Sequence, residues 1–183
     1  MRIALGIEYC GVGFCGWQSQ PSGCGIQDAL AAAITSIAGE PISVTAAGRT
    51  DTGVHAAFQV VHFDTHTQRP LTAWVRGVNS HLPSGMAVLW AREVDADFHA
   101  RFSAIERGYR YVLLNHAVRP GLNKGLVGWY YRPLDEGAMR EAAAYLLGEH
   151  DFSAFRAAEC QAKSPIKTLH RASIERRGDF LLC

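Results

Sequence analysis

Asp51 is the side chain best placed for chemistry, because it stands in a glycine-bounded loop close to an arginine. Gly48 and Gly53 bracket the loop, and glycine permits backbone shapes that other residues resist. In an extended chain, residues two apart point the same way, so Arg49 can reach the Asp51 carboxylate. A neighbouring guanidinium favours the ionised carboxylate, which is the form that a nucleophile or a general base needs.

Two other interpretations of this loop stay open on the residues alone. A glycine-bounded turn with a local ion pair needs no chemistry and is the commoner use of such a segment. Asp51-Thr52-Gly53 also spells the D-T-G of aspartic proteases, which need two carboxylates that share a proton. The chain has one D-T-G, so a homodimer would have to supply the second carboxylate, and Arg49 would hold both ionised. The protease interpretation is therefore disfavoured.

The elements that flank the loop must position it. Apolar periodicity predicts strands at 3–9, 42–47, 58–63 and 86–94 and helices at 26–37 and 71–82. This β-α-β-β-α-β order is that of a split βαβ, or ferredoxin-like, unit. Asp51 then lies in the connection between the second and third strands.

The second half of the chain begins near Phe98. It contains strand-like stretches at 109–114, 168–176 and 179–183, a glycine-punctuated loop at 121–128 and a helix at 135–148. Asp135 and Gly148 are the expected caps of this helix. We divide the chain into an N-terminal half, 1–97, with the candidate catalytic loop 48–56, and a C-terminal half, 98–183. The C-terminal half could be a degenerate copy of the first that lacks its last helix and strand.

The chain ends in an apolar, strand-like run at 180–183. Domains usually end in frayed polar residues, so this ending predicts a protein truncated at its C-terminus, with an open sheet edge at the last strand. A short edge strand that ends the domain naturally is the alternative.

Composition restricts the class of protein. With 183 residues, 48% hydrophobic and 19% charged, the chain can bury a core and is not disordered. Arg outnumbers Lys 15 to 3, which suits phosphate binding or reflects a GC-rich genome. Five cysteines without a C-x-x-C pair predict reduced thiols, including a buried Cys160, and no metal site. Without a signal peptide or a membrane-length apolar run, a soluble cytoplasmic protein is expected.

Several motifs in order carry a family resemblance along essentially the whole chain. The loop reads GRTDTGVHA, and six further segments match at 16–20, 59–64, 98–104, 107–111, 119–120 and 150–156. With these motifs the chain resembles the bacterial tRNA pseudouridine synthase A family. It departs from the family at Cys10, where Asp is usual, at Thr52, where Ala is usual, and in stopping where the family continues.

The resemblance implies an α+β fold of two ferredoxin-like halves that share a central antiparallel sheet, here with the second half incomplete. It implies a homodimeric, cofactor-free isomerase that converts uridine to pseudouridine in the tRNA anticodon stem-loop, at tRNA positions 38 to 40. Asp51 takes the place of the catalytic aspartate, Arg49 that of its arginine partner, and Tyr109 that of the tyrosine that packs on the target uracil. The expected RNA-contacting arginines are Arg101, Arg107, Arg110, Arg119 and Arg156.

In a second hypothesis, the chain binds RNA but does not catalyse the reaction. A ferredoxin-like unit can serve as a binding platform alone, so the chain could be an inactive RNA-binding fragment of such an enzyme. Pseudouridine formation on unmodified tRNA separates the two hypotheses.

Overall fold

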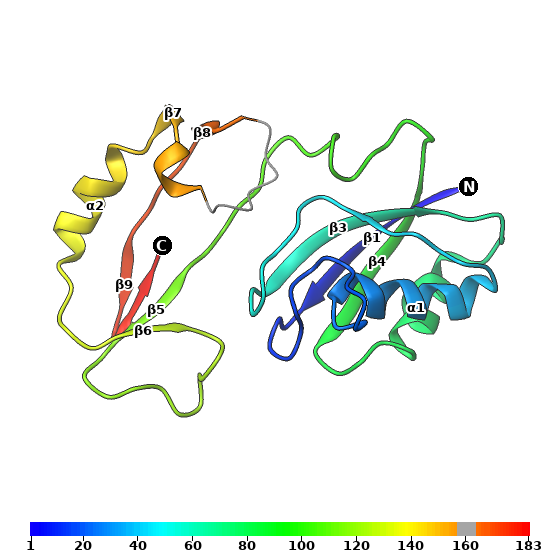
Figure 1. The fold of residues 1–183 in the computed structure, drawn as a ribbon, viewed down its shortest axis with the longest axis horizontal. Helices are drawn as coiled ribbons and strands as arrows, with labels where there is room; N and C mark the ends of the chain where they lie inside the picture. Colours follow the sequence, from blue (N-terminus) through cyan, green and yellow to red (C-terminus); the bar gives the residue numbers. More distant parts are fainter. Residues whose placement is uncertain (157–163) are drawn as a thin grey trace. The chain divides into compact units, whose positions relative to one another are not determined.

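The computed structural model describes residues 1–156 and 164–183, which form two compact units, Met1–Arg107 and Gly108–Cys183 (Figure 1). Cys160 lies outside the described residues, so its expected burial is not examined. Among the residues that are described, no helix has the length and apolar character to cross a membrane.

The first unit is built on a four-stranded antiparallel sheet in the order β2-β3-β1-β4. The strands are β1 (Arg2–Tyr9), β2 (Thr45–Ala46), β3 (Ala56–Asp64) and β4 (Met86–Val94). All four predicted strands of this half are present. The second is shorter than predicted, because only two residues of the stretch 42–47 pair with β3.

Two helical segments supply the core on one face of this sheet. They are α1 (Ile26–Ala38) and the π-helical turn η1 (Ala73–Gly77), and Figure 1 shows α1 lying across the strands. Every second side chain of β1 packs against these helical segments, because alternate side chains of a strand lie on the same face of the sheet. The side chains with less than 2% exposure are mostly from these elements: Ile3, Leu5, Ile7, Ile26, Leu30, Ile34, Val61, Phe63, Trp74 and Val78.

The opposite face of the sheet anchors the segment that follows β4. The Arg2 guanidinium bonds the Asp64 carboxylate at 2.8 Å and donates to the carbonyl oxygen of Phe98 at 2.7 Å. His62 is only 5% exposed, and its Nδ1 accepts a hydrogen bond from the Ala100 amide at 3.2 Å. The chain around 98–100 is therefore fixed to the first unit.

The second unit contains a mixed four-stranded sheet in the order β6-β5-β10-β9. Its strands are β5 (Val112–Asn115), β6 (Gly128–Tyr130), β9 (Glu175–Arg177) and β10 (Phe180–Leu182). β5 and β6 run parallel, and the other pairs are antiparallel. The remaining described elements are α2 (Glu136–Ala144), β7 (Gly148–Asp151), η2 (Ser153–Phe155) and β8 (Ile166–Leu169), with β7 paired to β8.

The expected open edge at the last strand is wrong, because β10 lies between β5 and β9. Gly178, with φ of +59°, turns the chain between β9 and β10. Tyr111 and Cys183 then exchange two backbone hydrogen bonds of 2.8 and 2.9 Å. Leu181 is fully buried as a result, so the apolar run at 180–183 belongs to the centre of a sheet.

Two further predictions for this half are corrected. Asp135 does cap α2, since its carboxylate accepts from the amides of Gly137 and Ala138. The helix ends at Ala144, however, and Gly148, with φ of +94°, begins β7 instead of capping the helix. The predicted strand 168–176 is divided between β8 and β9.

We predict that acid destabilises the first unit partly through His62. Burial lowers the pKa of His62, as do the positive charge of Arg2 and the nearby His99, while Asp64 opposes them. The folded state therefore binds this proton less readily than the unfolded chain, whose histidine pKa is about 6.5. This contribution is complete above that pH and is lost as the pH falls towards the folded pKa.

The test compares thermal unfolding of the wild type and His62→Gln at about pH 7.5 and 5.5. Glutamine keeps a side-chain acceptor for the Ala100 amide but does not titrate. The variant should lose less stability on acidification than the wild type does. An equal loss in both proteins would contradict the assignment.

Candidate active site

Asp51 occupies the first position of a tight turn that is closed by its own backbone. The Val54 amide donates to the Asp51 carbonyl oxygen at 3.1 Å, and Gly53 has φ of +81°. A positive φ at the third residue is the requirement of a type II turn, and glycine meets it without steric cost. The Asp51 side chain is exposed, so the turn presents its carboxylate to solvent.

Thr50 ties the residue before Asp51 to the core. Its hydroxyl lies 2.8 Å from the Tyr9 hydroxyl, and its carbonyl oxygen accepts the Trp17 amide at 2.8 Å. Tyr9 and Trp17 are 3% and 2% exposed, and their ring centroids lie 6.0 Å apart. The backbone beside the candidate catalytic residue is therefore bonded to groups that cannot move without disturbing the core.

Two glycines of the loop 11–25 allow this backbone to come so close. Gly16 has φ of +89°, and a Cβ there would lie 2.8 Å from the Thr50 carbonyl oxygen and 3.1 Å from the Asp51 carbonyl carbon. A Cβ on Gly11 would lie 2.2 Å from the Val54 carbonyl oxygen. Sequence reasoning placed Gly16 in a motif without a role. A close approach of two loops leaves no periodic signal, and only the glycine density of 11–25 hints at it.

Arg107 fixes the other end of the candidate catalytic loop. Its Nε and Nη2 donate to the Ala47 carbonyl oxygen at 3.0 and 2.6 Å, and Nη2 also donates to the Arg101 carbonyl oxygen at 3.1 Å. The Gln59 amide nitrogen donates to the Gly48 carbonyl oxygen at 2.7 Å. In the structure the Arg107 guanidinium thus supports the loop backbone, and its predicted contact with RNA stays a prediction.

Cys15 and Cys24 form a disulfide, so the prediction of reduced thiols is wrong for this pair. The Cys15 amide donates to the Cys24 carbonyl oxygen at 3.0 Å, and their Cα atoms are 5.4 Å apart, within the disulfide range. The loop conformation brings them together, which sequence spacing could not show. Among the described cysteines, Cys10 and Cys183 are thiols.

The other predicted site residues are divided between the units. Arg49 and Arg101 are exposed residues of the first unit, like Asp51. Tyr109, which is 78% exposed, and Arg110 belong to the second unit, in the segment that leads into β5. The first unit thus contains Asp51, Arg49, Arg101 and Arg107, and the contact of Tyr109 with the target base stays a prediction.

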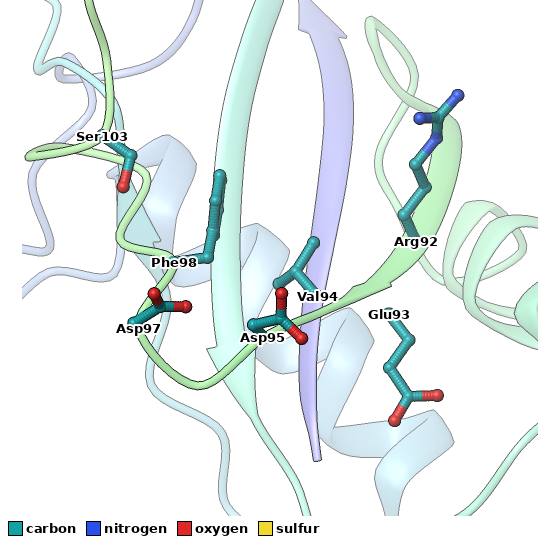
Figure 2. Close-up of a pocket in the computed structure, with 7 residues that line it drawn as sticks. All are labelled: Arg92, Glu93, Val94, Asp95, Asp97, Phe98 and Ser103. Atoms are coloured by element: carbon teal, nitrogen blue, oxygen red, sulfur yellow. The ribbon is translucent and has the colours of Figure 1, made fainter.

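A cavity of about 490 Å³ in the first unit lies where β4 ends. Figure 2 shows its lining, which is made by Arg92, Glu93, Val94, Asp95, Asp97, Phe98 and Ser103. Three carboxylates against one guanidinium make it unfavourable for phosphate, and no residue of 48–56 lines it. In the described part of the chain, no three His, Cys, Asp or Glu side chains gather closely enough to hold a metal ion.

Comparison with known proteins agrees with the resemblance read from the motifs. The tRNA pseudouridine synthase family profile matches residues 6–103 and 142–181. A tRNA pseudouridine synthase A from Thiobacillus denitrificans is 76% identical over all of this chain, which spans 70% of that relative. Those from Methylobacillus flagellatus and Dechloromonas aromatica are 62% and 63% identical over the same shares of both chains. The chain belongs to the tRNA pseudouridine synthase family.

Proposed function

We propose that this chain isomerises uridine to pseudouridine in tRNA and that Asp51 carries the reaction. The observation that supports this most is the setting of the Asp51 carboxylate, which is exposed on a turn closed by its own backbone hydrogen bond and preceded by Thr50, which bonds the buried residues Tyr9 and Trp17. Such a group keeps its position when a substrate arrives, so little reorganisation opposes the reaction. The relatives that match the whole chain carry the same activity in their names.

The reaction needs no more than such a carboxylate. The N1–C1′ bond of uridine breaks, the uracil turns, and a C5–C1′ bond forms, while C5 loses a proton and N1 gains one. No electron is transferred, and no external energy is required. Asp51 can attack the ribose or the base as a nucleophile, or remove a ribose proton as a general base.

Exposed cationic and aromatic residues recognise the substrate, each with a separate role. The target is the anticodon stem-loop, at tRNA positions 38 to 40, and its uridine must leave the stack, which costs a few kcal/mol. Tyr109 offsets part of this cost by stacking on the uracil. Arg49 pairs with Asp51 and helps to displace the base, while Arg101 and Arg110 bind phosphates.

The architecture that we propose is a pair of ferredoxin-like halves, 1–97 and 98–183, with a shared central sheet and an incomplete second half. For the first half, support comes from the order β2-β3-β1-β4 with α1 and η1 as connections, which is the arrangement of a split βαβ unit. The shared sheet and the incomplete second half rest on the family resemblance.

Asp51→Asn is expected to abolish pseudouridine formation while tRNA binding survives. The amide keeps the shape of the side chain but can act neither as nucleophile nor as base. Asp95→Asn, at an exposed aspartate of the acidic cavity, is the matched control and should retain activity. The measurement is pseudouridine released on digestion of unmodified tRNA, together with tRNA affinity. Turnover near that of the wild type would remove Asp51 from the reaction, and binding by an inactive wild type would favour the RNA-binding fragment.

Gly16→Ala is expected to lower turnover, and Gly13→Ala is its control. Both glycines have φ of +89°, so both alanines carry a similar backbone strain of about 1–2 kcal/mol. Only Gly16 is crowded by Thr50 and Asp51, whereas nothing lies within 4 Å of a Cβ on Gly13. The alanine at 16 must push the candidate catalytic turn aside, and overpacking of this kind costs a further ~1–3 kcal/mol.

Turnover at saturating tRNA and thermal unfolding of both variants provide the comparison. Gly16→Ala should reduce kcat about ten-fold or more beyond the loss in Gly13→Ala. Equal kcat values in the two variants would show that the contact between Gly16 and the turn does not position Asp51.

We also propose that the protein is a cytoplasmic homodimer. Large apolar side chains are exposed on the second unit, including Leu122 at 100% and Val118 at 65%, and exposed apolar patches commonly mark an interface. Light scattering should give a mass of about 40 kDa, twice the 20.0 kDa of one chain. A single species at the mass of one chain, independent of concentration, would contradict the dimer.

A further inference from the structure

Phe102 is a large apolar ring that the first unit fixes in an exposed position. It lies in a turn in which the Ser103 amide donates to the His99 carbonyl oxygen at 2.7 Å. The Phe102 side chain is 77% exposed, yet it stacks on the His99 ring at 4.2 Å with an interplanar angle of 29°. Leaving such a ring in water forgoes the free energy of burial, so an ordered, exposed phenyl group indicates a contact made with another molecule.

The support beneath this ring continues into the core. His99 Nδ1 accepts hydrogen bonds from the amides of Arg101 and Phe102, at 3.2 and 3.3 Å, which sets the orientation of the imidazole. The His99 ring in turn meets the buried His62 ring edge-on at 4.9 Å. Because each ring is fixed by the one below it, Phe102 presents a stable aromatic surface.

A positively charged side chain lies beside this aromatic surface, and hydrogen bonds connect the surface to the loop that carries Asp51. The Arg101 guanidinium carbon lies 5.8 Å from the centre of the Phe102 ring. The carbonyl oxygen of Arg101 and that of Ala47, which precedes Gly48, accept hydrogen bonds from the same Arg107 guanidinium. One side chain thus fixes both the turn that carries Phe102 and the loop that carries Asp51.

We propose that Phe102 stacks on an unpaired base of the tRNA other than the target uridine. Arg101 binds the adjoining phosphate, and Arg107 is the positioning residue between this subsite and Asp51. An aromatic ring beside an arginine is the combination that binds unstacked RNA bases without strong sequence preference. The inference rests on the proposed function for the identity of the ligand as tRNA. It adds a second stacking site, in the first unit, to the one assigned to Tyr109.

The test measures the affinity of unmodified tRNA for Phe102 variants in the Asp51→Asn background, where binding is separate from turnover. Phe102→Ala should weaken binding about ten-fold, the effect expected for one lost base stack, and Phe102→Trp should restore it. Leu71→Ala is the matched control, because Leu71 is a large apolar side chain, 44% exposed in the same unit, that has no ring to stack on a base. Its affinity should not change.

Three outcomes would overturn the proposal. Unchanged affinity in Phe102→Ala would show that no base stacks there. Full recovery of affinity by Phe102→Leu would show that the ring packs against protein, either the second unit or another copy of the chain. A fall in melting temperature that parallels the loss of binding would show a structural role. If Asp51→Asn stays active, the proposed catalytic role fails instead, and the affinity comparison for Phe102 keeps its meaning.

Discussion

The contact between the loop 11–25 and the backbone of Thr50 and Asp51 is the constraint on which the candidate site depends. An exposed carboxylate on an unsupported loop would sample many positions, and this conformational freedom would have to be lost before the transition state could form. Here the Trp17 amide and the bare Cα of Gly16 restrict that backbone from the side of the core, and the Tyr9 hydroxyl bonds the Thr50 side chain. The side chain can then face solvent while its attachment point stays fixed.

Hydrogen bonds to the backbone also fix the start of the candidate catalytic loop. Arg107 lies 60 residues after Ala47 in the chain, yet its guanidinium donates to the Ala47 carbonyl oxygen, just before the candidate catalytic loop. The Arg107 guanidinium donates its hydrogen bonds to the backbone carbonyl oxygens of Ala47 and Arg101, which carry no net charge. Its positive charge therefore contributes to the electrostatic field at the start of the candidate catalytic loop, which favours a polyanionic ligand such as tRNA.

Local periodicity predicted the parts of the fold whose packing is local. The alternation of Ile3, Leu5 and Ile7 predicted β1, the apolar stripe through Leu30 and Ile34 predicted α1, and Asp135 was recognised as a cap. The glycines at 48 and 53 marked the Asp51 loop, and the order of short motifs along the chain gave the family resemblance, which the comparisons confirm.

What sequence reasoning missed are relations between distant segments. Nothing in the apolar run of β10 says that it has a neighbour on each side, and nothing in the spacing of Cys15 and Cys24 says that they meet. The role of Gly16 depends on the backbone of Thr50, which is 34 residues away in the chain. The residue next to Gly16, Trp17, donates its amide hydrogen bond to the same Thr50 carbonyl oxygen. Such facts arise when the elements assemble, so they follow from the fold and not from any window of residues.

The central place of β10 also has a consequence for the order in which the protein forms on the ribosome. Every contact within Met1–Arg107 is available once that segment has emerged, so the first unit, with Asp51 and its supports, can fold during synthesis. β5 emerges soon afterwards and can pair with β6, but its antiparallel partner β10, Phe180–Leu182, emerges much later. Until then one side of β5 has no strand partner, and its pairing with β10 closes a long loop, which is a slow step in folding. The loop that carries Asp51 is therefore assembled before the sheet of the unit that carries Tyr109.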